Sequence, residues 1–214
     1  DSTAVIYPMK AHNRRRERRE AIISFLSARY SRVIDLTQYE KRGMFLEGTG
    51  SLVLDRISRE AYACISERTN SELVSAWATA LGYRTFCFEA FDTAGQPIYH
   101  TNVMMNIATK FAVVCMECIT APSEREALAS MLAESGRVVI ETSYAQLHAF
   151  CGNILELKGS SAEPCIFMSG TARAAFTDAQ LEKLGMCGKI CVCDVPTIEH
   201  YGGGGVRCML AELF

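Results

Sequence analysis

Cys208 is the residue whose surroundings most favour covalent chemistry. It follows the glycine run 202–205 and Arg207, within the apolar run 206–214. A neighbouring positive charge favours the thiolate, which is the reactive form of a cysteine. Glycines allow the backbone to approach a small ligand closely, and we interpret the run in that way. A cysteine can also be a small buried hydrophobic residue, so this position by itself leaves both interpretations open.

Two further side chains could complete a catalytic set with Cys208. His100 lies in the segment 97–102, just before a strand-like run, and Glu47 lies between an apolar pair and a glycine turn in the segment 45–50. A single histidine is often structural, and most acidic residues are solvated. The three types together offer a nucleophile, a general acid/base and a carboxylate that can bind cationic or amide N–H groups.

The charge balance favours a small-molecule substrate over a macromolecular partner. The 214 residues include 22 Lys and Arg against 24 Asp and Glu, a formal net charge of −2. Nucleic-acid sites are strongly basic, and no apolar run here reaches the roughly 18 residues that a membrane span needs. The basic run 14–19 is interrupted by Glu17 and suits a solvated helix start. We therefore expect neither nucleic acid nor membrane as a partner.

The ten cysteines indicate a reducing compartment. Most have apolar neighbours and suit buried free thiols, so we expect a cytoplasmic protein. The pairs Cys115/Cys118 and Cys191/Cys193 have spacings seen in zinc sites, but both lie in strand-like runs and no second pair completes a ligand set. We expect no metal and no organic cofactor.

Four helices are expected at regular intervals, and they position the candidate residues. They cover residues 13–30, 70–81, 123–134 and 177–184. Asn70 is suited to cap the second helix, and Thr177 with Gln180 forms a capping box at the fourth. The starts are separated by 57, 53 and 54 residues, which indicates a repeat of about 55 residues.

Strand-like runs flank each helix in a constant order. They cover residues 4–7, 32–36, 51–54, 61–65, 84–88, 104–108, 111–115, 138–141, 154–157, 165–168, 189–193 and 206–214. The predicted unit is strand–strand–helix–strand, in which the first copy lacks its opening strand and the last run has no helix after it. Three complete units and two incomplete ends predict a single α/β domain over 1–214, organised as an incomplete ring whose repeats bury a core through their neighbours.

Several motifs together resemble the guanidine-modifying (pentein) superfamily. They are FLEGTGSLVLDR, ACISERTN, PIYHTNVMM, CGNILEL and GGGGVRCMLAE. The likeness is greatest to the arginine-deiminase-related branch that includes citrulline hydrolases and amidinotransferase-like proteins. It implies a five-bladed α/β propeller of ββαβ modules, of which this chain lacks part of the N-terminal module.

The resemblance assigns roles to five residues. It implies that Cys208 attacks the central carbon of a guanidinium or ureido group, that His100 protonates the leaving nitrogen and then activates water, and that Glu47 binds the terminal nitrogens of the substrate. By the same resemblance, Arg68 contacts the substrate α-carboxylate. Arg14 is a second candidate for that contact, in a motif that is matched only loosely.

Asn102 departs from the pattern of arginine deiminases, which have an acidic residue two positions after the catalytic histidine. An amide can donate and accept hydrogen bonds, so it suits a neutral ureido group better than a cation. Citrulline is therefore the expected substrate, ahead of arginine. An acidic residue that relatives carry in an early module has no counterpart in this chain.

Other outcomes of the same fold remain open. The chain could be an amidinotransferase or a non-catalytic pentein-like binding or assembly protein, although the joint presence of Cys208, His100 and Glu47 favours catalysis. An incomplete ring exposes strand edges. We therefore expect a homo-oligomer or pairing with the missing N-terminal segment.

Overall fold

Strands and helices alternate along the chain, as the sequence predicts. The computed structural model describes residues 2–159 and 162–213, so Phe214, the end of the last predicted strand, lies outside the described residues. The strands are β1 (Thr3–Ile6), β2 (Arg32–Asp35), β3 (Val53–Asp55), β4 (Glu60–Cys64), β5 (Arg84–Phe88), β6 (Met105–Ile107), β7 (Phe111–Val114), β8 (Val138–Glu141), β9 (Leu155–Lys158), β10 (Pro164–Ser169) and β11 (Lys189–Cys193). The α-helices are α1 (Glu20–Arg29), α2 (Ser71–Leu81), α3 (Thr101–Met104), α4 (Pro122–Glu134), α5 (Tyr144–His148), α6 (Gly170–Ala175), α7 (Asp178–Cys187) and α8 (Pro196–Gly202). Short 3-10 helices are η1 (Arg14–Glu17), η2 (Thr37–Arg42), η3 (Met116–Cys118) and η4 (Val206–Met209).

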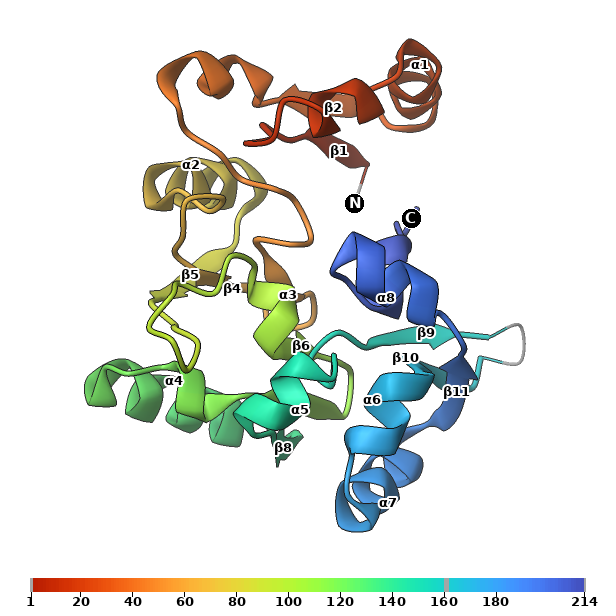
Figure 1. The fold of residues 1–214 in the computed structure, drawn as a ribbon. Helices are drawn as coiled ribbons and strands as arrows, with labels where there is room; N and C mark the ends of the chain where they lie inside the picture. The colour runs from red at the N-terminus through yellow and green to blue at the C-terminus, as the bar shows by residue number, and fades with distance from the viewer. Residues whose placement is uncertain (1, 160–161, 214) are drawn as a thin grey trace.

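Three sheets share one topology, which confirms the predicted repeat. In each, the first two strands are antiparallel, and a helix then leads to a third strand parallel to the second: β3-β4-β5 with α2, β6-β7-β8 with α4, and β9-β10-β11 with α7. The fourth sheet pairs β1 and β2 in parallel across α1 and has no opening strand. Figure 1 shows the four sheets following one another around the molecule. The described strands form no closed barrel, and the five-bladed propeller stays a prediction.

The apolar core lies between neighbouring modules. One cluster joins Leu36 and Met44 to Leu73 and Trp77 of α2, and two further clusters join the second module to the third and the third to the fourth. Trp77 also donates a hydrogen bond from Nε1 to the Tyr7 hydroxyl at 2.8 Å. Each module therefore completes its core only through its neighbour, as expected of a repeat architecture.

Local end signals account for the three helices predicted best. The Asn70 side chain accepts a hydrogen bond from Leu73 N at the start of α2, and Gly82 ends that helix at φ 69°. Pro122 begins α4, and the capping box of Thr177 and Gln180 begins α7. These residues satisfy or remove the free N–H groups of a first turn, so the helix starts follow from the sequence.

The first predicted helix is wrong over its N-terminal half. Residues 14–17 form the 3-10 turn η1, and α1 starts only at Glu20. Arg15 Nε donates to the Met9 carbonyl at 2.9 Å, and Arg18 pairs with Glu40. These tertiary contacts direct Arg15 toward Met9 and Arg18 toward Glu40. A continuous helix over residues 13–30 would not place both side chains in this way.

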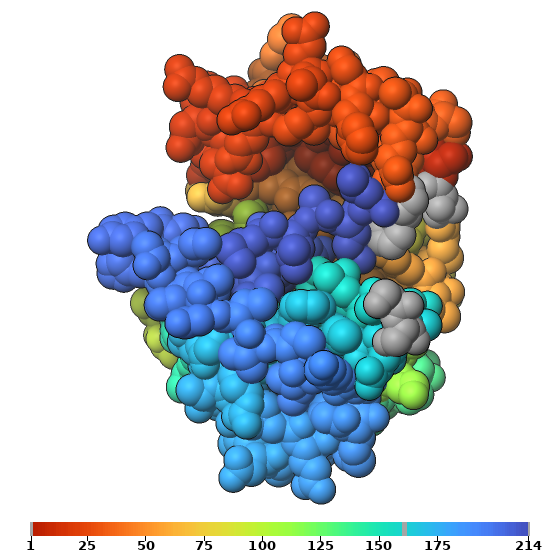
Figure 2. Space-filling model, turned by 90° about the vertical axis from the view of Figure 1, so that its right-hand side faces the viewer, coloured from red at the N-terminus to blue at the C-terminus, as the bar shows by residue number. Residues whose placement is uncertain are grey.

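The last predicted strand is also wrong. Val206–Met209 is the 3-10 helix η4, and none of the described residues after β11 belongs to a sheet. The apolar run favours a strand, but a strand needs a hydrogen-bonded neighbour, and none of the described strands pairs with this segment. Figure 2 shows the C-terminal segment lying between the N-terminal module and the fourth module.

Shorter helices were not predicted, because they follow from contacts or from brief capping signals. They are α3, α5, α6 and α8, of four to seven residues each. The helical turn α3 shortens the predicted strand 104–108 to β6. In the part of the chain that the structure describes, no helix has the length and hydropathy that crossing a bilayer requires.

A buried ion pair connects the second and third modules. Arg137 donates from Nη1 and Nη2 to the two carboxylate oxygens of Asp55 at 2.8 and 2.9 Å, and the side chains are 6% and 1% exposed. Burial raises the pKa of Asp55, but the N–H of Ser58 and the Arg137 guanidinium outweigh it, so that this pKa is lowered. The carboxylate is ionised and fixed between two modules.

We expect Arg137→Met to lower the free energy of unfolding by about 3 to 5 kcal/mol, because it leaves a buried carboxylate without its cation. Arg84→Met is the matched control: it removes an ion pair with Glu60 in which the arginine side chain is 78% exposed, and should cost less than about 1 kcal/mol. Urea denaturation measures both, and equal losses would contradict the role given to Asp55.

Candidate active site

A buried carboxylate, that of Glu47, forms one wall of the site. Its side chain is 2% exposed. Oε1 accepts the backbone N–H of Lys10 at 2.8 Å, and Oε2 lies 2.8 Å from His100 Nε2 and 3.4 Å from Arg68 Nη1. Three segments that are distant in sequence therefore converge on one charge. The structure brings Glu47, His100 and Arg68 into contact, and their catalytic and substrate-binding roles stay predictions.

The surroundings of Glu47 keep it ionised. Burial raises the pKa of Glu47, but the His100 hydrogen bond, the Lys10 N–H and the charges of His100 and Arg68 outweigh it, so the pKa is lowered. An ionised carboxylate only accepts hydrogen bonds, so His100 Nε2 must be the donor. Such a pairing fixes the ring orientation, as an acid/base histidine requires.

Short contacts between two loops hold His100 in place. Ser51 Oγ accepts the N–H of Glu47 at 2.8 Å, and the Ser51 carbonyl accepts the Thr101 hydroxyl at 2.6 Å. Gly50 lies so close to the His100 ring that a Cβ there would be 2.8 Å from ring atoms. A glycine is therefore required at position 50.

Cys208 lies against two asparagine amides. Asn153 Nδ2 donates to the sulfur at 3.2 Å, and Asn102 Nδ2 lies 3.8 Å from it. Among the described residues, the hydrogen-bond contacts of this sulfur are with these amides and not with His100. Asn102 is two residues from His100, so the same segment supplies the contact to the sulfur and the contact to Glu47.

The glycine run brings its own backbone close to these side chains. A Cβ at Gly204 would be 2.9 Å from the Cys208 sulfur, and one at Gly205 would be 3.0 Å from Asn153 Oδ1. The Gly203 carbonyl accepts the Tyr99 hydroxyl at 3.0 Å. Gly204 and Gly205 therefore allow close packing around Cys208, and the approach of this backbone to a small ligand stays a prediction.

The arginines differ in their relation to the site. Arg68 lies over the Tyr99 ring at 5.4 Å. Arg14 bonds Glu17, which raises the pKa of Arg14; burial opposes this, and Glu47 and Cys208 add to the rise. The side chain of Arg207, which the sequence places beside Cys208, donates to the Leu210 carbonyl at 3.1 Å.

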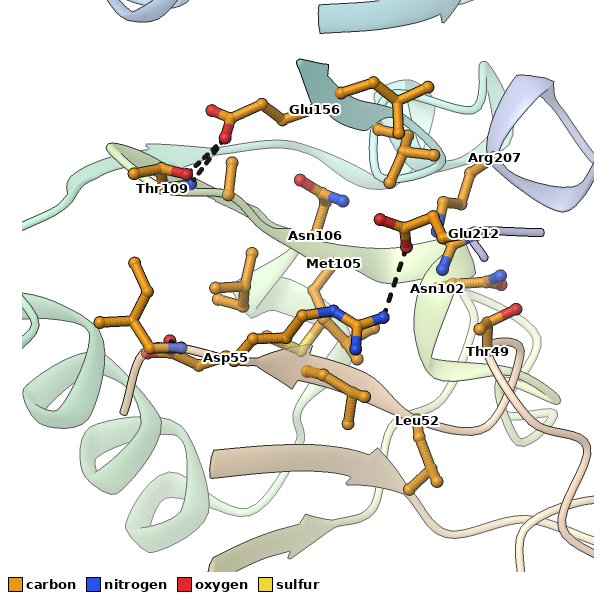
Figure 3. Close-up of a pocket in the computed structure, with 18 of the residues that line it drawn as sticks. Thr49, Leu52, Asp55, Asn102, Met105, Asn106, Thr109, Glu156, Arg207 and Glu212 are labelled. Carbon is orange, nitrogen blue, oxygen red and sulfur yellow. Dashed lines mark hydrogen bonds and ion pairs between the residues drawn. The ribbon is translucent and has the colours of Figure 1, made fainter. Parts of the chain in front are cut away.

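Asn102 also lines a cavity of about 650 Å³. Figure 3 shows Asn102, Arg207 and Glu212 at one end of it and Thr109 with Glu156 at the other. Cys208, His100 and Glu47 do not line this cavity. No group of three or more potential ligands in the described part of the chain could hold a metal ion.

The sequence matches the family described as N,N dimethylarginine dimethylhydrolase, eukaryotic, over residues 1–214. The chain belongs to this family. Its place in the guanidine-modifying superfamily, which groups hydrolases and amidinotransferases, agrees with the resemblance in its motifs. No curated protein sequence matches the chain significantly.

Solved structures of the superfamily share the fold. The chain is similar to ArgZ, an arginine dihydrolase from cyanobacteria, with a TM-score of 0.73 and 18% identity over 98% of this chain and 30% of that one. It is also similar to dimethylarginine dimethylaminohydrolase in its adduct with 4-chloro-2-hydroxymethylpyridine, with a TM-score of 0.62 and 15% identity over 98% of this chain and 72% of that one. For SxtG, an amidinotransferase from Microseira wollei, the TM-score is 0.62 and the identity 14%, over 97% of this chain and 63% of that one. The chain thus spans less than a third of the length of ArgZ.

Sequence reasoning missed two members of this site, Asn153 and Tyr99. Both lie inside motifs that carry the family resemblance, CGNILEL and PIYHTNVMM. Asn153 is 2% exposed although it precedes an apolar strand. A buried amide needs a partner, but only the structure shows that the partner is Cys208.

We expect Cys208 to be alkylated faster than any of the other nine cysteines in this family member. All ten lie within the described residues, and Cys208 alone is exposed. Burial raises the pKa of Cys64 to about 12 and also raises the pKa of Cys187, which makes those thiols poor nucleophiles. Mass spectrometry after limiting iodoacetamide measures this order, and earlier labelling of Cys64 or Cys187 would contradict it.

Proposed function

We propose that this protein is a cysteine-dependent hydrolase of a C–N bond in a ureido or guanidino amino acid, with citrulline as the first candidate substrate and arginine as the second. One observation carries the proposal. The segment 100–102 contacts the ionised Glu47 through His100 and the Cys208 sulfur through Asn102. A single turn of the chain, residues 100–102, therefore carries the candidate acid/base and also contacts the candidate nucleophile.

The proposed reaction has two steps. The Cys208 thiolate forms a bond to the central carbon of the ureido group, and the C–N bond to the leaving nitrogen breaks as His100 gives that nitrogen a proton. His100 then takes a proton from water, whose oxygen attacks the same carbon and releases the product from the sulfur. The Glu47 carboxylate accepts the N–H of His100 Nε2 and so keeps the ring oriented through both steps.

Glu47 also bears on how a substrate would bind. The resemblance gives it the terminal nitrogens of the substrate, and Arg68, which contacts it, the α-carboxylate. Arg68 is 30% exposed in its side chain, and its Nε has no partner among the described residues. An arginine side chain that is partly exposed beside Glu47 suits a carboxylate ligand. Arg14, which is paired with Glu17, is a weaker second candidate.

The alternatives differ in what accepts the group carried on Cys208. An amine in place of water would make the protein an amidinotransferase, the activity named for SxtG, and a binding or assembly protein would show no turnover. We further propose a cytoplasmic location, since all ten cysteines are free, and leave a homo-oligomer or pairing with an N-terminal segment as part of the hypothesis.

Incubation of the full-length protein with citrulline should release ornithine, ammonia and carbon dioxide, because hydrolysis at the ureido carbon leaves a carbamate that decomposes. The reaction with arginine should be slower. Cys208→Ser should lower the rate at least about 10²- to 10³-fold, because a hydroxyl at neutral pH is much less nucleophilic than a thiolate. Cys193→Ser is the control for a cysteine outside the site. Full turnover in Cys208→Ser would exclude the covalent mechanism, and a requirement for an added amine would favour the transferase.

Asn102→Asp should weaken citrulline turnover and improve arginine binding. The variant places a carboxylate where a neutral amide now lies 3.8 Å from the sulfur, and a carboxylate attracts a guanidinium more than a ureido group. The ratio of kcat/KM for the two substrates measures the change. Asn106→Asp, also buried but without a contact to Cys208, controls for the added charge. An unchanged ratio in Asn102→Asp would place the selectivity elsewhere.

A further inference from the structure

Asn153 is the point where three separate motifs meet. It belongs to the loop before β9, and its Nδ2 donates to the Cys208 sulfur at 3.2 Å and to the Asn102 carbonyl at 3.0 Å. Asn102 lies in the first turn of α3, and Cys208 comes from the C-terminal segment. The side chain is 2% exposed, so both donors of this amide are used inside the protein.

The loop that carries Asn153 is fixed by close packing. A Cβ at Gly152 would be 2.6 Å from the Val103 carbonyl oxygen, so only glycine allows this approach. Phe150 adopts a φ of 64°, and the Asn153 N–H donates to the Phe150 carbonyl at 2.9 Å. The side chain of Asn153 is therefore held in place by backbone contacts that do not involve Cys208.

The orientation of the Asn153 amide follows from its neighbours. The Asn102 carbonyl and the Cys208 sulfur are both acceptors, so the group facing them must be the NH₂ and not the oxygen. Asn153 Oδ1 has no partner among the described residues. The hydrogen bonds of this buried amide are therefore made by its N–H groups and not by its oxygen.

We propose that Asn153 is a positioning residue that orients the Cys208 sulfur and stabilises it as a thiolate; this rests on the proposed function of Cys208 as the nucleophile. A hydrogen bond to a charged acceptor is about twice as strong as one to a neutral acceptor, so an N–H at 3.2 Å favours the thiolate over the thiol. Asn102 is held in the same contact, which keeps the neutral amide beside the sulfur.

Arg207, the sequence neighbour of Cys208, interacts with it through its charge but makes neither of the two hydrogen bonds described for the sulfur. Arg207 donates to the Leu210 carbonyl, and its side chain is drawn into the cavity shown in Figure 3. The hydrogen bonds that reach the sulfur come from neutral amides. Stabilisation of the thiolate by Asn153 therefore adds no net charge to the site.

The test is the rate of Cys208 alkylation by iodoacetamide as a function of pH, measured by mass spectrometry on the full-length protein. Asn153→Ala should lower the rate near pH 7 about tenfold and move the profile about one unit to higher pH, because the thiolate loses a donor. Asn153→Asp, of nearly the same shape, should move it further, since a carboxylate repels the thiolate. It also covers the case in which Asn153→Ala fails to fold.

Asn106→Ala is the matched control. Asn106 is 6% exposed, and its Nδ2 donates to the Ile154 carbonyl at 2.8 Å, next to Asn153 in sequence. Loss of this buried amide should leave the alkylation profile unchanged. A profile for the Asn153 variants that coincides with the wild type, or a shift of the same size in Asn106→Ala, would overturn the proposal.

Turnover separates this proposal from the proposed function. If Asn153 acts through the sulfur, Asn153→Ala should lower kcat with little change in KM, since Asn153 touches Cys208 and not the place assigned to the substrate. A shifted alkylation profile in a protein without turnover would uphold the role of Asn153 and reject the hydrolase. Full turnover in Asn153→Ala together with an unshifted alkylation profile would support the hydrolase and reject the role of Asn153.

Discussion

The Glu47 carboxylate is the interaction on which the rest of the site depends. It is almost fully buried, and a buried charge is costly unless it is paired and hydrogen-bonded. Its partners come from Lys10 after the first strand, Arg68 after β4 and His100 before α3. Moving any of these segments away would remove part of the compensation for this buried charge. The carboxylate therefore fixes the loops around it, and through His100 it fixes the position of Asn102 and so of the contact to Cys208.

The site residues occupy equivalent places in successive modules, which explains why they meet. Glu47 precedes β3, Asn102 precedes β6 and Asn153 precedes β9, and each of these strands opens a ββαβ unit. Modules that pack against their neighbours through a shared core bring such equivalent loops to a common end of the assembly. Gly50 and Gly152 lie in two of these loops, and each lets one loop touch the next without a Cβ in between. The repeat architecture thus brings these loops together, and their polar side chains form the contacts of the candidate site.

The parts that could be predicted from sequence are those with local causes. Asn70 and the capping box at Thr177 are complete signals within four residues, and the order of strands around each helix follows from apolar runs. Residues 14–18 and 206–209 were predicted wrongly because their conformation depends on partners elsewhere: Glu40 holds Arg18, and none of the described strands pairs with Val206–Met209. Asn153 shows the same limit. Its motif is visible in the sequence, but its contact with Cys208 joins residues 55 positions apart.

The distribution of charge around the sulfur bears on the kind of substrate. Glu47 is the carboxylate that contacts His100, and both of its oxygens are already occupied, one by the Lys10 N–H and the other by His100 and Arg68. The groups that touch the sulfur, Asn102 and Asn153, are neutral amides. A cationic guanidinium beside Cys208 would have to compete with His100 and Arg68 for that one carboxylate, whereas a neutral ureido group can exchange hydrogen bonds with an amide. Under the function proposed above, this arrangement of one occupied carboxylate and two neutral amides favours a ureido substrate over arginine.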